Sequence, residues 1–386
     1  MCATSTHTCS ADPTRREEDS FISLGGDSLS YVEAAVRMSQ LLDDLPHDWA
    51  QLSAHQLAAT APAHRTPHDR WAAVETSVIL RAVAILLIVG THANLLSVMG
   101  GAHVLLAVVG FNLARFQLSR RPRTERRRGL LQAARHVAVP SAIWIAATGL
   151  ATGMYDTSTA LMLNGVLGSD TWDVRWQFWF LEAVVWTMLA ASLAVSVPAL
   201  DRLERTHRFG VATTVLLVAL VTRYALVGVE AGPSERYALP MVLWCVALGW
   251  MAARAETVRQ RTIVSVAAMI ACWGYFDDPF REGLVAAGVC ALVWIPHLRV
   301  PAVLVPGLSV LAASSLFVYL THWQVYPHLE VDHPLWATVA SFAVGIGVWR
   351  AYGASSSATA AVWHSARRPR PRRLPSTRSR PRDGAR

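Results

Sequence analysis

The chain has 386 residues, and 53% of them are hydrophobic. Its mean hydropathy of +0.32 is high for a soluble protein of this size, and much of the surplus lies in long apolar runs, which predict a membrane protein with several spans. The net charge is +8, yet all 35 basic residues are arginines. Any mechanism that needs a lysine, such as a Schiff base or a P-loop, is therefore excluded.

The arginines lie mainly in segments between apolar runs and in the C-terminal tail. That distribution follows the positive-inside rule of membrane proteins and argues against a nucleic-acid partner. The five cysteines show neither CxxC nor zinc-finger spacing, so neither a metal site nor a disulfide framework is predicted. The N-terminus lacks the apolar segment of a cleavable signal peptide.

The N-terminal part divides into three stretches. Residues 1–20 are polar and without pattern, and we expect them to be disordered. Residues 21–60 carry apolar side chains at helical spacing and predict a small helical module. Residues 61–75 contain Pro62 and Pro67 and are predicted to form a linker.

Ser28 lies in the motif Leu24-Gly-Gly-Asp-Ser-Leu29, where a Gly-Gly turn precedes a predicted helix. The N-terminus of a helix favours a bound phosphate group. The plain alternative is a helix N-cap, for which Ser and Asp are common. The motif resembles the attachment site of acyl and peptidyl carrier proteins. That resemblance implies a covalent 4'-phosphopantetheine on Ser28, added by a phosphopantetheinyl transferase and loaded by an acyl-activating enzyme.

The segment departs from the carrier family before Ser28. Carrier domains have a helix well upstream of the modified serine, whereas residues 1–20 contain Pro13 and almost no apolar side chains. A truncated, vestigial carrier is therefore the alternative to a functional one.

Residues 76–352 form the predicted membrane domain, in which ten apolar stretches are interpreted as spans. They are residues 77–98, 101–118, 136–154, 176–197, 209–228, 237–253, 262–276, 283–297, 309–328 and 334–352. Residues 353–386 are rich in small residues and then in Arg and Pro, so we expect a disordered tail. The predicted fold class is all-α: a polytopic bundle of about ten membrane helices, preceded by the small helical module.

The loops between these stretches alternate in charge. Arginines fill the loops after spans 2, 4 and 6 and the tail, whereas the intervening loops are acidic or neutral. Because positively charged loops stay in the cytoplasm, an even number of spans places both termini there. The predicted location is the cytoplasmic membrane.

The first span carries two ionisable residues, Arg81 and His92, eleven positions apart. Eleven residues are close to three helical turns, so the two side chains are predicted to share a face, about 16 Å apart along the axis. Ionisable groups inside a span are costly and are usually functional. The alternatives are a packing histidine and an arginine that reaches the interface.

Several segments together resemble the acyltransferase 3 family, over about residues 75–352. They are Ile79-Leu-Arg-Ala-Val-Ala-Ile-Leu-Leu-Ile-Val-Gly-Thr-His-Ala93, Phe178-Trp-Phe-Leu-Glu182 and Ser314-Ser-Leu-Phe-Val-Tyr-Leu-Thr-His-Trp-Gln-Val325. Two positions depart from the family pattern. Val109 replaces a serine in the second span, and a single Arg135 stands where the family has paired arginines before the third.

The resemblance implies acyl transfer and assigns roles to three residues. His92 is expected to act as the general base or as a transient acyl acceptor, since histidine titrates near neutral pH. Arg81 is expected to hold a phosphate of the donor or to orient the site. His322, expected at the same depth as His92, would orient the acceptor. Glu182 is a further candidate, either for fixing a histidine tautomer or as an interfacial carboxylate.

Three functions remain open from the sequence. The first is a membrane acyltransferase that moves an acyl group from a thioester on Ser28 to a hydroxyl acceptor, such as a glycan, a lipid or a natural product. The second is the same enzyme with free acyl-CoA as donor and a vestigial carrier. The third is a transporter or scaffold in the bilayer without acyl chemistry, because intramembrane Arg and His also serve transport.

Overall fold

The computed structural model describes residues 20, 21, 31, 34, 38, 49–60, 70–119, 122–168, 172–232 and 235–366, without the side chains of residues 54, 60 and 356–366. Ser28, most of the predicted carrier-like segment and residues 367–386 lie outside the described residues. Contacts divide the chain into residues 1–346 and residues 347–386.

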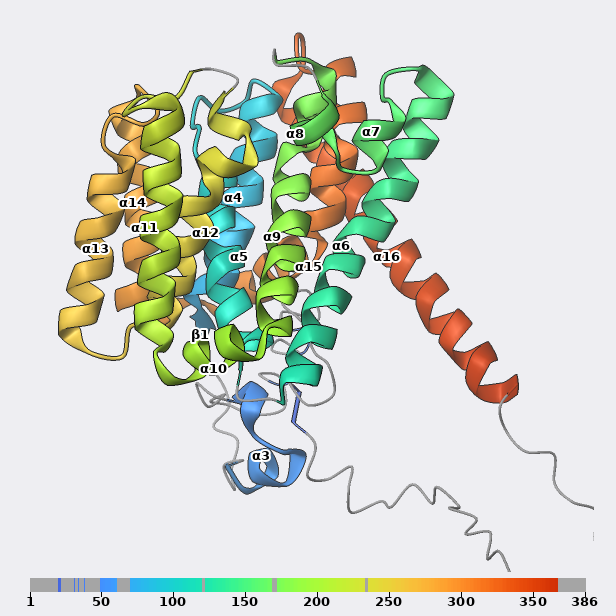
Figure 1. Ribbon diagram of the computed structural model, residues 1–386. Helices are drawn as coiled ribbons and strands as arrows, with labels where there is room; N and C mark the ends of the chain where they lie inside the picture. The colour runs from blue at the N-terminus through green and yellow to red at the C-terminus, as the bar shows by residue number, and fades with distance from the viewer. Residues whose placement is uncertain are drawn as a thin grey trace, which may run out of the picture. The chain divides into compact units, whose positions relative to one another are not determined.

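The described chain is predominantly helical, and a helix covers most of each apolar stretch that the sequence predicts (Figure 1). These helices are α4 (Thr76–His92), α5 (Gly101–Asn112), α6 (Arg123–Thr152), α9 (Trp179–Ser196), α11 (Arg208–Val227), α12 (Leu239–Ala253), α13 (Val258–Cys272), α14 (Pro279–Trp294), α15 (Val305–Thr321) and α16 (Pro334–Ala366). Helices α4, α5, α9 and α15 stand in the middle of the bundle, where α4 packs against both α5 and α15.

Shorter elements connect them. They are η1 (Trp49–Gln51), α3 (Ala54–Thr60), the π-helical turn η2 (Leu113–Gln117), α7 (Thr157–Ala160), α8 (Asn164–Leu167), η3 (Val174–Phe178), α10 (Pro198–Thr206), η4 (Glu235–Tyr237), η5 (Ala302–Leu304), η6 (His322–Gln324) and η7 (Tyr326–His328). Helix α3 lies within residues 21–60, where the sequence predicts a small helical module.

Three segments among the described residues are long and apolar enough to cross a membrane: Val174–Ser196, Arg208–Val227 and Ala302–His328. Helices α4 and α12 are apolar but shorter. The structure thus supports a membrane protein, while the count of ten crossings stays a prediction.

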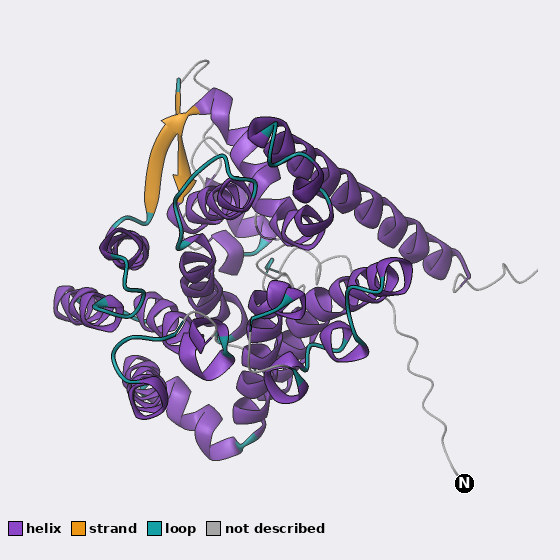
Figure 2. Cartoon of the chain, turned by 90° about the horizontal axis from the view of Figure 1, so that it is seen from above, coloured by secondary structure: helices purple, strands orange, loops and turns teal. Residues whose placement is uncertain are grey.

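A two-stranded antiparallel sheet corrects the all-α prediction. Strand β1 (Trp71–Glu75) lies at the end of the predicted linker and pairs with β2 (His297–Pro301), with Glu75 opposite His297. Figure 2, in which many helices are seen end-on, shows the two strands at the periphery. With two alanines and a partner more than two hundred positions away, β1 carries little local strand signal. The pairing joins the start of α4 to the segment that precedes α15.

The arginine-rich segment after the second span is also more ordered than predicted. Helix α6 already begins at Arg123, and Arg126 is fully buried. Its guanidinium forms ion pairs with Asp201, at 2.5 Å, and with Glu204. Glu204 also accepts from Arg254 at 2.8 Å. The network ties α6, α10 and the end of α12 together at what we call the basic end of the bundle, the end that carries Arg115, Arg126, Arg208, Arg254 and Arg261.

The predicted disordered tail begins too early. Helix α16 continues to Ala366, whereas the sequence places the tail from residue 353. The added segment is rich in alanine, which has the highest helix propensity, and the next proline is Pro369. Residues 353–366 are therefore helical.

Two glycines allow α5 and α12 to pack with their backbones in contact. A Cβ added at Gly110 would lie 1.9 Å from the Val246 carbonyl oxygen, and one at Gly249 would lie 1.8 Å from that of Ala107. Small residues at helix crossings permit such close approach in membranes. This packing holds the helix that leads into η2.

We predict that Gly110→Ala destabilises the protein, because the obstructing atoms belong to backbone and the two helices must separate. Overpacking of this kind costs about 1–3 kcal/mol. Thermal unfolding and folded yield of the purified protein measure the effect. Gly307→Ala is the matched control, since a Cβ there meets nothing within 4 Å. Equal unfolding temperatures for the two variants would contradict the close packing.

Candidate active site

Two histidines from parallel helices meet inside the bundle. His92 is the last residue of α4, and His322 begins η6 directly after α15. Nδ1 of His92 lies 2.9 Å from Nε2 of His322, and the ring planes differ by only 6°. His322 is fully buried. The contact agrees with the equal depth that the sequence predicts for the two residues.

The hydrogen-bond pattern assigns the tautomers of the neutral pair. Nδ1 of His322 lies 2.7 Å from the Tyr319 carbonyl oxygen, which can only accept, so this nitrogen carries the proton. Nε2 of His322 must then accept, and Nδ1 of His92 must donate to it. The lone pair of His92 consequently resides on Nε2, where it is free to accept a proton, as a general base requires.

His92 borders a cavity of about 130 Å³ near the end of the bundle opposite the basic end. The Trp323 ring lies 4.4 Å from that of His92, centroid to centroid, and limits its movement. The polar and aromatic side chains of the lining are Thr91, His92, His103, Trp172, Trp179, Tyr237, Arg281, Tyr319 and Trp323. An aromatic wall with few polar groups is typical of small-molecule sites.

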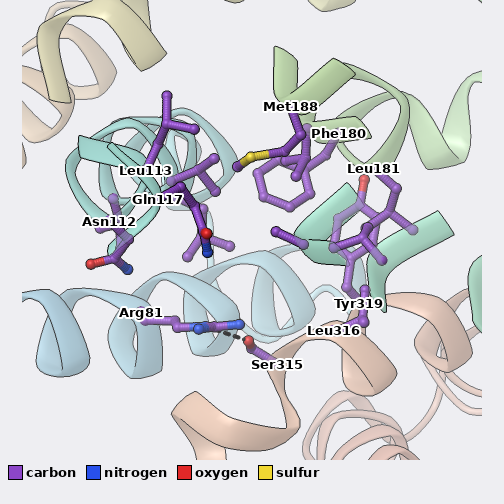
Figure 3. Close-up of a pocket in the computed structure, with 16 residues that line it drawn as sticks. Arg81, Asn112, Leu113, Gln117, Phe180, Leu181, Met188, Ser315, Leu316 and Tyr319 are labelled. Carbon is purple, nitrogen blue, oxygen red and sulfur yellow. Dashed lines mark hydrogen bonds between the residues drawn. The ribbon is translucent and has the colours of Figure 1, made fainter. Parts of the chain in front are cut away.

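Arg81 borders a second, mostly apolar cavity of about 80 Å³ (Figure 3). Its Nε donates to Oγ of Ser315 on α15 at 2.8 Å. The amides of Asn112 and Gln117, at the two ends of the π-helical turn, add polar groups to the lining. Tyr319 borders this cavity as well as that of His92.

The structure thus places Arg81, His92 and His322 along one interface. Arg81 contacts α15 at Ser315, and His92 contacts the residue seven positions later, His322. Both α4 residues therefore face α15, as their spacing predicts. Ser28, the fourth predicted site residue, lies outside the described residues.

Glu182 does not set a histidine tautomer. Its carboxylate accepts from the backbone N–H groups of Asn164, at 3.2 Å, and Gly165, at 2.7 Å. It therefore caps the N-terminus of the short helix α8, and the Tyr319 carbonyl orients His322 instead. The sequence could not distinguish these roles because α8 has only a weak helical signal.

A large cavity at the basic end is lined by residues that the sequence does not single out. It has a volume of about 600 Å³, and its charged lining residues are Glu75, Arg115, Arg208, Arg254 and Arg261. Arg115 lies inside an apolar stretch that is predicted as a span, and an arginine at such a position indicates a functional site. Arg208 lies in the loop after the predicted fourth span, whereas Arg254 and Arg261 lie in the loop after the sixth, and the two loops come together only in the fold.

The described residues of the N-terminal module pack against this end. Tyr31 is buried, stacks on Trp49 at 5.0 Å and contacts the Phe116 ring at 4.6 Å. Burial raises the pKa of Tyr31, so its hydroxyl stays protonated and donates to the Glu75 carboxylate. Arg115 pairs with the same carboxylate. Tyr31, three positions after Ser28, is thus anchored beside the basic cavity.

Comparison with known proteins identifies the family. The model of the acyltransferase domain of acyltransferase 3 matches residues 78–352. The chain belongs to the acyltransferase 3 family. No curated protein and no solved structure matches it significantly. The match extends from α4 to residue 352 in α16 and includes the histidine pair and the cavities of Arg81 and His92. It supports a membrane acyltransferase in general terms.

We predict that neutral His92 carries its proton on Nδ1 and that His322 enforces this tautomer. In the nitrogen-15 spectrum of protein labelled at histidine, the His92 signals, assigned by their loss in His92→Gln, should show the Nδ1-protonated form. In His322→Phe, which cannot accept a hydrogen bond, that preference should disappear. A spectrum of His92 that His322→Phe leaves unchanged would contradict the assignment.

Proposed function

We propose that the protein transfers an acyl group from a thioester donor to a hydroxyl acceptor, with His92 as general base. The observation that carries this is the oriented His92 ring, whose Nε2 lone pair is left available by the hydrogen bonds to His322 and Tyr319. His92 borders a cavity large enough for a small acceptor group.

In this mechanism Nε2 of His92 takes the proton from the acceptor hydroxyl while the oxygen attacks the thioester carbonyl. The C–S bond then breaks, an ester forms, and the proton passes from His92 to the departing thiolate. Meanwhile Nδ1–H of His92 donates to His322, which stabilises the transient imidazolium. In a two-step transfer, Nε2 of His92 would itself accept the acyl group transiently.

The cavity of Arg81 suits the donor. Its lining is apolar apart from a few polar groups, among them Arg81, Asn112 and Gln117, which supports a role in holding the acyl-pantetheine arm. Because Tyr319 borders both cavities, a donor in this cavity would meet His92 beside the Tyr319 ring.

The orientation follows from charge. Placing the basic end in the cytoplasm satisfies the positive-inside rule for a protein of the cytoplasmic membrane, and the even number of predicted spans then gives both termini a cytoplasmic location. A cytoplasmic donor would then enter from the basic end, and His92 would lie nearer the opposite face.

The preferred donor is an acyl group on 4'-phosphopantetheine attached to Ser28. The anchoring of Tyr31 to Glu75 and Phe116 supports it, since Tyr31 lies at the basic end and follows Ser28 by three positions in the sequence. A tethered donor reaches effective concentrations of about a millimolar without further contacts. Loading requires a phosphopantetheinyl transferase and an acyl-activating enzyme as partners.

Free acyl-CoA is the second candidate donor, and the basic cavity favours it. Four arginines and a single carboxylate line about 600 Å³ there. Guanidinium groups bind phosphate in a bidentate manner, and CoA carries more phosphate charge than a carrier-bound arm. In that case the N-terminal segment has no catalytic part.

We predict that His92→Gln lowers acyl transfer from a thioester by about 10²–10⁴-fold, the usual contribution of a general base. The exposed His328→Gln is the matched control and should retain full activity. Transfer is measured by mass spectrometry of the acylated acceptor at equal levels of membrane-inserted protein. Full activity of His92→Gln would eliminate this mechanism, and absence of any transfer by the wild-type protein would favour a transporter or scaffold.

A second experiment separates the donors. Incubation with a promiscuous phosphopantetheinyl transferase and CoA should add one phosphopantetheine to the wild-type protein and none to Ser28→Ala, as seen in the intact mass. With the donor loaded in cis, Ser28→Ala should abolish transfer. If Ser28→Ala keeps its activity with acyl-CoA while Arg261→Gln raises the KM for acyl-CoA, the free donor is correct and the tethered donor is wrong.

A further inference from the structure

We infer that the cavity beside His92 holds the acceptor through an anionic group, a carboxylate or a phosphate, bound by Arg281 beside His103. This inference rests on the proposed function and specifies the class of its acceptor. Both residues border the same cavity as His92, and neither belongs to the histidine pair.

Arg281 is a buried cation with no carboxylate paired to it among the described residues. Only 4% of its surface is exposed. The neighbouring Glu282 accepts instead from the backbone N–H of Phe276, at 3.3 Å. Because buried charges in proteins are normally paired, an arginine in this state is a site that an anionic ligand can complete.

The contacts that Arg281 does make are weak acceptors. The guanidinium lies over the Phe276 ring at 4.2 Å, and its two terminal nitrogens approach the thioether of Met99, at 3.9 Å, and Nδ1 of His103, at 3.4 Å. The Tyr237 hydroxyl also lies within interaction range. These groups hold the guanidinium in place, but none of them neutralises its charge.

His103 adds a second donor to the same cavity. It is 1% exposed, and its Nδ1 faces the Arg281 guanidinium, which can only donate. The proton of the neutral ring therefore resides on Nε2, which makes no close hydrogen bond among the described residues, although the Arg236 backbone carbonyl lies within interaction range. A buried N–H group without a close hydrogen bond is unusual in a native protein and is satisfied when a ligand oxygen binds.

Arg281 suits an oxyanion of the acceptor rather than its reacting hydroxyl, whereas Nε2–H of His103, on the ring edge away from Arg281, would meet a different oxygen. Arginine binds carboxylate and phosphate groups through paired N–H bonds, while the His92 lone pair needs a hydroxyl that can give up a proton. The aromatic rings of Trp172, Trp179 and Tyr237 line the same cavity as His92 and Arg281. An acceptor with a hydroxyl at one end and an anionic group at the other, such as a uronic acid or a sugar phosphate, fits this arrangement.

Binding to the full chain in lipid nanodiscs tests the inference without requiring turnover. Isothermal titration calorimetry at constant ionic strength compares D-glucuronate with D-glucose, and glycerol 3-phosphate with glycerol. The wild-type protein should bind at least one anion about tenfold or more tightly than its neutral analogue, since hydrogen bonds between charged groups are the stronger ones. The pair that shows the difference tells a carboxylate from a phosphate.

Variants locate the binding to Arg281. Arg281→Gln should remove the preference for the anion, whereas Arg281→Lys should keep part of it because the charge remains. The exposed Arg299→Gln controls for net charge and should bind as the wild type does. Thermal unfolding checks that each variant is folded, and the wild-type comparison stands even if Arg281→Gln does not fold.

Two results would overturn the inference: a wild-type protein that binds anions and their neutral analogues alike, or not at all, and an Arg281→Gln protein with an unchanged preference. Thioester turnover that depends on His92 is measured separately. If it is present while the preference for anions is missing, the proposed function survives and only the anionic acceptor fails. If the preference is present and turnover does not depend on His92, the anion-binding site stands and the proposed function fails.

Discussion

The hydrogen bond between His92 and His322 is the contact on which the account of this protein depends. It forms only if α4 and α15 run in parallel with their ends at one depth. Strand β1 leads directly into α4, and β2 precedes α15 by the short turn η5, so the β1–β2 pairing joins the starts of the two helices. The Arg81–Ser315 hydrogen bond connects α4 and α15 again between their starts and the histidine pair. The backbone carbonyl of Tyr319 then determines which nitrogen of His92 is free. A backbone carbonyl inside the site thus sets the tautomer of the reacting ring through His322.

Polar groups follow one another along the bundle. Arg81 borders one cavity, the histidine pair lies further along α4 and α15, and Arg281 on α14 and His103 on α5 border the cavity of His92. Under the proposed function the first cavity holds the donor and the second the acceptor. Each of these polar groups is surrounded by apolar or aromatic side chains, which strengthens its electrostatic effect and raises the cost of leaving it unpaired. Tyr319 separates the two cavities, so the acyl group would cross from one to the other at this residue.

The sequence predicted the helices and part of the site because both rest on local patterns. Apolar runs located the ten main helices, and the eleven-residue spacing placed Arg81 and His92 on the face that meets α15. Long-range pairings were not predictable in this way: β1 has its partner more than two hundred positions away, Arg126 is buried by carboxylates of α10, and Arg281 joins His103 across the bundle. Glu182 was wrongly considered for the histidine pair because its actual partner, the start of α8, carries no clear signal.

An experimental structure with a non-hydrolysable thioether analogue of acyl-CoA would test the central claim most directly. The pantetheine arm is predicted to pass from the basic end into the cavity of Arg81, with the acyl group beside Tyr319 on the Nε2 side of His92. An analogue bound with its acyl group away from His92, or facing the Nδ1 side that His322 occupies, would contradict the account.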